Sequence, residues 1–189
     1  MTLKKLIAAA GGLALLLSPL LAQAQSWPVT VKDLDNRTVT VEHEPQRIIL
    51  QDGRDIFALA LLERDNPFAK VVAWNNLPKK QDTQTWNVLK RKWPEAEKIL
   101  DMKFSDQGNV DLETVISRQP DLMIAQLRAK PSLVQTGVLA KLDALHIPVI
   151  LVDYELHPVE NTLPSIALLG KVMGQTARAQ AYMDFYQQR

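Results

Sequence analysis

Four side chains that could bind an anionic or aromatic ligand each lie at or just after the end of a short apolar run: Arg54, Trp74, Arg128 and Tyr154. A planar guanidinium pairs with a carboxylate through two parallel hydrogen bonds, and an aromatic ring packs against apolar or aromatic ligand surface. Together the four residues favour an anionic, partly aromatic ligand. For each residue taken alone, a surface role is an equally good interpretation.

Motifs for catalysis or for direct metal binding are missing from the sequence. His43, His146 and His157 lie far apart without neighbouring carboxylate clusters, and there is no cysteine. The sequence also lacks a Gly-x-Ser-x-Gly elbow, a His-Glu-x-x-His motif and a phosphate-binding loop. These observations predict a binding surface, with no catalytic residues, no metal ligands and no resident cofactor.

From residue 47 onward, short apolar segments alternate with segments of helical periodicity. The expected strands are 47–50, 70–74, 122–125 and 148–152, and the expected helices are 55–62, 84–93, 111–118 and 132–145. This alternation predicts an α/β fold with a mostly parallel sheet flanked by helices. Ligands of such sheets bind beyond the carboxyl ends of the strands, which is where the four candidate residues lie. Phe57, Trp86 and Trp93 fall within helical patterns and are expected in the core.

Before this region, residues 29–32 and 37–41 alternate apolar and polar side chains around Asp35 and Asn36. Asp and Asn suit a tight turn between two antiparallel strands. The sequence therefore predicts an N-terminal β-hairpin.

The first 24 residues have the form of an export signal. Lys4 and Lys5 precede an uncharged apolar run over 6–21, and Ala22-Gln23-Ala24 fits a signal-peptidase site. The run is short for a membrane span of about 20 residues and contains Pro19. Cleavage would start the mature protein at Gln25 and change its formal net charge from +1 to about −1. We expect a soluble periplasmic protein rather than a lipoprotein, without nucleic acid as a partner.

The last segment predicts two helices. Ile166, Leu169 and Val172 form an apolar face that ends at Gly174, and a second helix starts near Thr176. The second helix carries an apolar stripe at Ala179, Tyr182, Met183 and Tyr186. Protein beyond this sequence could cover that stripe, or the helix could lie back on its own domain.

Several segments, in this order, resemble one known family. They are Asn36-Arg37-Thr38-Val39-Thr40-Val41, Pro45-x-Arg47-Ile48-Ile49, Gly53-Arg54-Asp55, Asn109-Val110-Asp111-Leu112-Glu113, Gln119-Pro120-Asp121-Leu122-Met123-Ile124, Ile147-Pro148-Val149-x-Leu151-Val152-Asp153 and Leu168-Leu169-Gly170-Lys171. The chain is similar to the periplasmic solute-binding proteins of ABC importers for ferric siderophores, haem and cobalamin.

The resemblance implies a two-lobed protein that binds an iron chelate between its lobes and delivers it to an inner-membrane ABC permease and its ATPase. Residues 25–161 would form the N-terminal lobe, residues 162–189 would be a helical segment with the start of a long interlobe helix, and the second lobe would be absent. The resemblance also implies acidic docking residues that meet arginines of the permease, and Glu95, Glu97 and Asp101 are the candidates.

Two other functions remain open from the sequence. One is a small periplasmic α/β enzyme that acts on a small anion. The other is a single-lobe interaction protein, derived from a binding protein by decay.

Overall fold

The computed structural model describes residues 26–102 and 111–188, so the expected signal peptide and Gln25 lie outside the described residues. The fold is α/β, as expected. A parallel sheet of five strands has the order β5 (Leu100–Asp101), β4 (Val71–Trp74), β3 (Ile48–Leu50), β6 (Leu122–Gln126) and β7 (Val149–Val152). The four expected strands are confirmed, and β5 is an addition.

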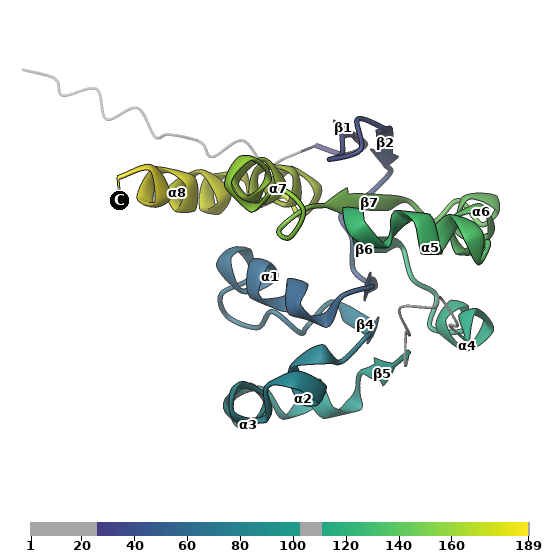
Figure 1. Ribbon diagram of the computed structural model, residues 1–189, viewed down its shortest axis with the longest axis horizontal. Helices are drawn as coiled ribbons and strands as arrows, with labels where there is room; N and C mark the ends of the chain where they lie inside the picture. Colours follow the sequence, from purple (N-terminus) through teal and green to yellow (C-terminus); the bar gives the residue numbers. More distant parts are fainter. Residues whose placement is uncertain (1–25, 103–110, 189) are drawn as a thin grey trace, which may run out of the picture.

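Helices cover both faces of this sheet (Figure 1). One layer contains α1 (Ile56–Leu62), α3 (Thr83–Lys92), α7 (Pro158–Val172) and α8 (Thr176–Gln187). The other contains α4 (Leu112–Ile116), α5 (Lys130–Gln135) and α6 (Val138–Ala144). Shorter elements complete the chain: η1 (Gly53–Asp55), α2 (Leu77–Gln81), η2 (Pro94–Lys98) and η3 (Leu127–Ala129).

Successive residues of each central strand enter opposite layers. In β6, Leu122 and Ile124 pack in the core under α1 and α7, whereas Met123 and Ala125 pack under α5 and α6. All five residues of β6 are buried. Burial on both faces explains why these strands read as continuous apolar runs rather than as alternating patterns.

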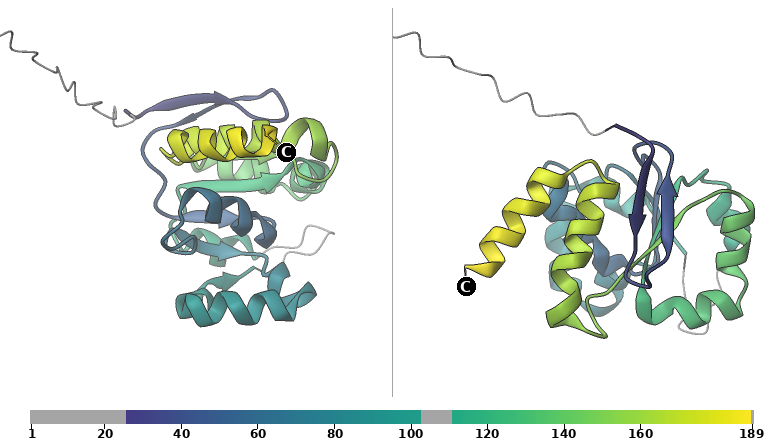
Figure 2. Two further views of the ribbon diagram at one scale, coloured as in Figure 1. Left: turned by 90° about the vertical axis from the view of Figure 1, so that its left-hand side faces the viewer. Right: turned by 90° about the horizontal axis from the view of Figure 1, so that it is seen from above.

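The N-terminal hairpin of β1 (Val29–Lys32) and β2 (Thr38–Val41) is antiparallel, as predicted. Its turn packs along the outer edge of β7. The buried Asp33 carboxylate accepts hydrogen bonds from Arg37 Nη2 at 2.6 Å and from Leu151 N at 3.2 Å, and Leu34 N donates to Leu151 O. The hairpin turn therefore pairs backbone groups of an edge strand that would otherwise be open. Figure 2 shows the hairpin lying across one end of the molecule.

Two expectations about the elements were wrong. The single helix expected over 132–145 is two helices, because Gly137 adopts φ of 73° and ends α5 before α6 begins. No element was expected between the strand at 70–74 and the helix at 84–93, yet α2 lies there, and its N-cap Asn76 accepts a hydrogen bond from Lys79 N. β5 has only two residues, too few to show a period.

Helix α8 lies back against α7 and α1 over its first half. Gly170 makes this contact possible, because a Cβ there would lie 2.4 Å from the Cβ of Ala179. Arg178 donates a hydrogen bond to the backbone oxygen of Leu62 in α1. In the apolar stripe predicted for α8, Ala179 is buried, whereas Tyr186, near the end of the helix, is 45% exposed.

Candidate functional site

The chain reverses its direction across the sheet between β3 and β6. From β3 it adds β4 and β5 on one side, and then crosses back to add β6 and β7 on the other. The loops after β3 and β6 therefore diverge from adjacent carboxyl ends, and this switch point is where open α/β sheets bind ligands. Gln51 Oε1 accepts a hydrogen bond from Gln126 N at 3.2 Å and joins the two loops.

Two arginines and two carboxylates meet at this point. The buried Asp52 accepts hydrogen bonds from Arg54 Nε at 3.0 Å and Nη2 at 2.5 Å, and from Arg128 Nη2 at 2.9 Å. Glu155 forms ion pairs with both arginines, at 2.6 Å to Arg128 Nε. The structure thus brings together Arg54 and Arg128 from loops that lie far apart in the sequence.

The charges of this cluster stabilise one another. Burial acts to raise the pKa of Asp52, but the hydrogen bonds and positive charge of Arg54, with the hydrogen bond from Arg128, hold it below its ordinary value. The hydrogen bond that Arg54 donates to Asp52 raises the pKa of Arg54. Asp52 is therefore ionised and fixes both guanidinium groups.

The loop after β7 carries Glu155 to the arginines because Asp153 organises it. The buried Asp153 carboxylate accepts hydrogen bonds from the backbone N–H groups of residues 155, 156 and 157, and from Asn161 Nδ2 at 2.7 Å. Burial acts to raise the pKa of Asp153, and these donors together hold it below its ordinary value. Ser165 of α7 accepts a hydrogen bond from Asp153 N, which ties the loop to the helix.

Behind the charged cluster lies a group of buried polar side chains. Asp55 is 2% exposed, and Gln126 Nε2 donates a hydrogen bond to its Oδ1. Burial and the charge of Asp52 raise the pKa of Asp55 well above its ordinary value. Burial, followed by the charge of Asp55, also raises the pKa of Tyr154. The pKa values of Asp52 and Asp55 are therefore shifted in opposite directions.

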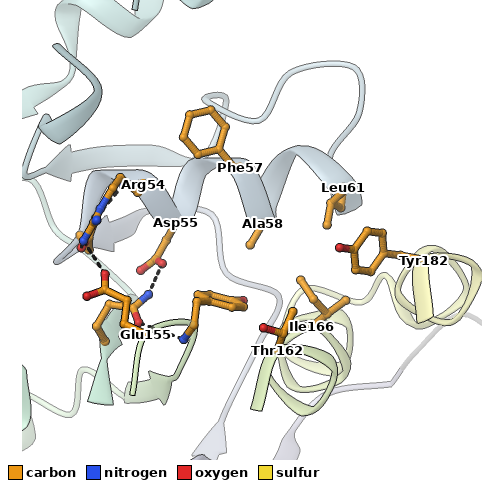
Figure 3. A pocket seen from close by; sticks show the side chains of 12 residues that line it. Arg54, Asp55, Phe57, Ala58, Leu61, Glu155, Thr162, Ile166 and Tyr182 are labelled. Atoms are coloured by element: carbon orange, nitrogen blue, oxygen red, sulfur yellow. Dashed lines mark hydrogen bonds and ion pairs between the residues drawn. The ribbon is translucent and has the colours of Figure 1, made fainter. Parts of the chain in front are cut away.

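A cleft of about 480 Å³ opens over these residues, between α1 and the helices α7 and α8 (Figure 3). Its polar end is formed by Arg54, Glu155 and the residues beneath them. Its apolar end is formed by Leu61 of α1, Ile166 of α7 and Tyr182 of α8. The full lining is Asp52, Arg54, Asp55, Phe57, Ala58, Leu61, Gln126, Tyr154, Glu155, Thr162, Ile166 and Tyr182.

Of the four candidates from the sequence, Arg54 and Tyr154 line the cleft and Arg128 lies beside it, bound to Asp52 and Glu155. Trp74 does not lie at the mouth of a loop. It is fully buried, with its ring 5.5 Å from Phe68 and 5.8 Å from Trp86. As the last residue of β4 it points into the core, where an aromatic cluster packs it.

Sequence reasoning passed over the carboxylates of this site. Asp52 lies in the same loop as Arg54, and Glu155 lies in the loop after β7. Acidic and basic residues at the ends of these strands were a signal for ion pairs. Phe57 was expected in the core, yet it is 45% exposed and contributes to the cleft. Helical periodicity did not show which side of α1 faces the cleft.

The structure separates the three acidic residues considered for docking. Glu95 and Glu97 are exposed on η2, before β5, and Asn66 donates a hydrogen bond to Glu95. Asp101 lies at the other end of β5, where it accepts hydrogen bonds from Asn76 N at 3.4 Å and Lys80 Nζ at 3.3 Å. Glu95 and Glu97 therefore belong to η2, whereas Asp101 lies at the carboxyl edge of the sheet beside α2.

A sequence profile of the periplasmic binding protein family matches residues 59–189. The chain belongs to this family. No curated protein shows significant similarity to the sequence. Among the described residues, no helix is long and apolar enough to cross a membrane. No group of three or more possible metal ligands occurs among His, Asp and Glu within the same residues.

Solved structures show the same fold. The TroA-like periplasmic binding protein FepB from Veillonella parvula aligns with a TM-score of 0.76 and 24% identity, over 85% of this chain and 47% of that chain. The molybdate-binding protein MolA from Haemophilus influenzae aligns with a TM-score of 0.63 and 15% identity, over 81% of this chain and 48% of that chain. The siderophore-binding protein BauB, bound to acinetobactin and ferric iron, aligns with a TM-score of 0.59 and 18% identity, over 86% of this chain and 51% of that chain. This periplasmic binding protein chain spans about half the length of these three structures.

Proposed function

We propose that the chain is the N-terminal lobe of a solute-binding protein that binds an anionic iron chelate, such as a ferric siderophore or haem, in the periplasm. The observation that carries this proposal is the pairing of Arg54 and Arg128 at the topological switch point, beside the cleft. Chelates of this class present carboxylate or other oxyanion groups, which guanidinium donors bind well.

Arg54 is placed to bind such a group. Its side chain is 41% exposed, and its ion pairs and side-chain hydrogen bonds with Asp52 and Glu155 use Nε and Nη2. Within the described residues, no hydrogen bond from Nη1 of Arg54 is found. Asp52 holds the guanidinium in one orientation, so little rotamer freedom is lost when a ligand binds.

Glu155 occupies the position that a ligand carboxylate would take. The Glu155 side chain is 34% exposed and pairs with both arginines. The Asp52 side chain also pairs with both arginines but is only 1% exposed. An anionic ligand would displace Glu155 and leave Asp52 in place. Glu155 thus competes with the ligand, and its negative charge lowers affinity for anions.

The remaining parts of the proposal follow from the family. The lobe would work with a second lobe, joined to it through α8 as the start of an interlobe helix, and would deliver its ligand to an ABC permease. Glu95 and Glu97 are the residues that would dock on that permease. Asp101 instead stabilises the contact of β5 with α2.

Calorimetric titration of the full chain tests the ligand class. We expect a ferric catecholate, a ferric hydroxamate or haemin to bind, and Arg54→Ala or Arg128→Ala to weaken that binding by about ten- to hundredfold. Glu155→Gln should strengthen it by several-fold, because the competing charge is removed. Arg91→Ala, on the exposed face of α3, is the matched control and should change nothing.

Two results would overturn the proposal. Equal affinity of both arginine variants and the parent for every chelate would place the ligand elsewhere. A heat of binding with molybdate, and with none of the chelates, would show that the ligand is a bare oxyanion; molybdate is the ligand bound in MolA.

A further inference from the structure

The cleft contains two buried oxygen atoms that form no hydrogen bond with any described residue: Asp55 Oδ2 and the hydroxyl of Tyr154. Both residues line the cleft. Asp55 is only 2% exposed, and its other oxygen is already bound by Gln126. In Figure 3 the Asp55 side chain leaves the start of α1 and points toward the loop that carries Glu155.

Two unpaired polar atoms at one place are costly for a folded protein. Burial of a hydrogen-bonding group without a partner destabilises the fold, and most buried polar groups are therefore paired. An apolar side chain of similar shape, such as Phe in place of Tyr154, would pack here without that cost. A ligand in the cleft that supplies the missing hydrogen-bond partner would explain why both oxygens are present in its wall.

Burial raises the pKa of Asp55 and of Tyr154, and this favours the protonated form of each, in which the oxygen can donate a hydrogen bond. Because Gln126 donates to Asp55 Oδ1, a proton on this carboxyl group is carried by Oδ2, the oxygen without a partner. Such donors fit a carbonyl, hydroxyl or phenolate oxygen of a ligand.

The surroundings of this pair are apolar. Leu61, Ile166 and Tyr182 line the same cleft, and the ring of Tyr182 points from α8 toward Leu61 on α1 (Figure 3). A ligand group that reaches the two oxygens therefore lies against aliphatic and aromatic side chains. Arg54 and Glu155 form the opposite, charged end of the cleft.

We propose that Asp55 and Tyr154 form a hydrogen-bonding subsite for an oxygen carried by an aromatic or acyl arm of the ligand, while Arg54 binds the anionic end. The proposal rests on the proposed function, because it describes the ligand of that site. It narrows the ligand to amphipathic chelates, such as those with aryl arms, and disfavours small polar chelates such as ferric citrate.

The test compares three probes by calorimetry: the ferric complex of 2,3-dihydroxybenzoate, iron-free 2,3-dihydroxybenzoate and ferric citrate. Tyr154→Phe removes only the hydroxyl. We expect this variant to bind both aryl probes about tenfold more weakly, without a lower melting temperature, because the atom removed is unpaired in the free protein. Ferric citrate should bind the parent more weakly than the ferric aryl complex. Tyr186→Phe, an exposed tyrosine on α8 outside the cleft, is the matched control and should behave as the parent.

A second pair of variants tests the donor role of Asp55. Asp55→Asn keeps an acceptor for Gln126 and places an N–H donor beside it, so it should retain affinity within about threefold. Asp55→Ala should lose about tenfold. An equal loss in both variants would overturn the assignment of a donor.

The remaining outcomes separate the subsite from the iron chelate. Binding of the iron-free aryl probe that is sensitive to Tyr154→Phe, with no binding of any ferric complex, supports the subsite and overturns the proposed function. Unchanged aryl binding in Tyr154→Phe overturns the subsite, as does a melting temperature that falls together with affinity. Failure of both aryl probes to bind the parent also overturns it.

Discussion

Asp52 and Asp55 lie three positions apart, and their pKa values are shifted in opposite directions because their surroundings differ. Asp52 accepts hydrogen bonds from two arginines, whose charges offset its burial. Asp55 receives one neutral amide donor, from Gln126, and its burial dominates. The sequence shows both residues in one loop, but the sequence alone does not show that one of them is buried without an arginine partner.

The raised pKa of Asp55 makes the stability of the protein depend on pH. The carboxyl binds its proton more tightly in the folded state than in the unfolded chain, where the pKa is close to 3.8. The free energy of unfolding therefore falls as pH rises above 3.8, by up to about 1.4 kcal/mol per pH unit until the folded pKa is reached. The neighbouring charged or titratable groups are Asp52, Arg54, Glu155 and Tyr154.

Asp55→Asn removes this proton linkage and keeps the acceptor for Gln126. Urea unfolding at a series of pH values should show the variant more stable than the parent at pH 7, by an amount that shrinks toward pH 4. Asp143→Asn, on the exposed face of α6, should change the free energy of unfolding by less than about 0.5 kcal/mol. A constant difference between Asp55→Asn and the parent across this range would show that Asp55 is ionised in the folded protein.

At the scale of elements, the local sequence pattern predicted the positions of the longer strands. The strands 48–50, 71–74, 122–126 and 149–152 are apolar runs because they are buried on both faces, and all four were expected. The order of strands in the sheet depends on contacts between distant segments, so the pairing of the loops after β3 and β6 could not be read from one sequence. Trp74 was misplaced for the same reason. Its position at a strand end was right, but the side on which α3 packs was unknown.

The loop after β3 depends on a close approach of two backbones. A Cβ at Gly53 would lie 2.2 Å from the backbone oxygen of Asn75, the residue after β4. Gly53→Ala should therefore lower the free energy of unfolding by about 1–3 kcal/mol and also weaken ligand binding, because Arg54 would move with the loop.

Gly137→Ala is the comparison for that substitution. Gly137 has φ of 73° and nothing within 4 Å of its added Cβ, so only backbone strain of about 1–2 kcal/mol is expected, with affinity unchanged. Chemical denaturation with parallel ligand titration measures both effects. Equal affinity of Gly53→Ala and the parent would show that the loop after β3 does not position the ligand.

At the scale of the whole molecule, the described residues combine a parallel sheet with a cleft at its carboxyl edge. Helices cover both faces of the sheet (Figure 1). The carboxyl edge carries the charged cluster and the cleft, and this chain spans about half the length of similar solved structures. A second lobe that faces this edge would enclose the ligand, in agreement with the family.

The central claim is that a ferric chelate binds at the carboxyl ends of β3, β6 and β7. High-spin ferric iron broadens the NMR signals of nearby amides, so one measurement tests both the ligand and its position. Addition of a substoichiometric ferric catecholate to the ¹⁵N-labelled protein, compared with the diamagnetic gallium complex, should broaden signals of residues 52–58, 126–128 and 153–157 first. Signals of the hairpin at 29–41 and of residues 143–147 should stay sharp. Broadening centred on the hairpin, or uniform broadening across the chain, would contradict the account.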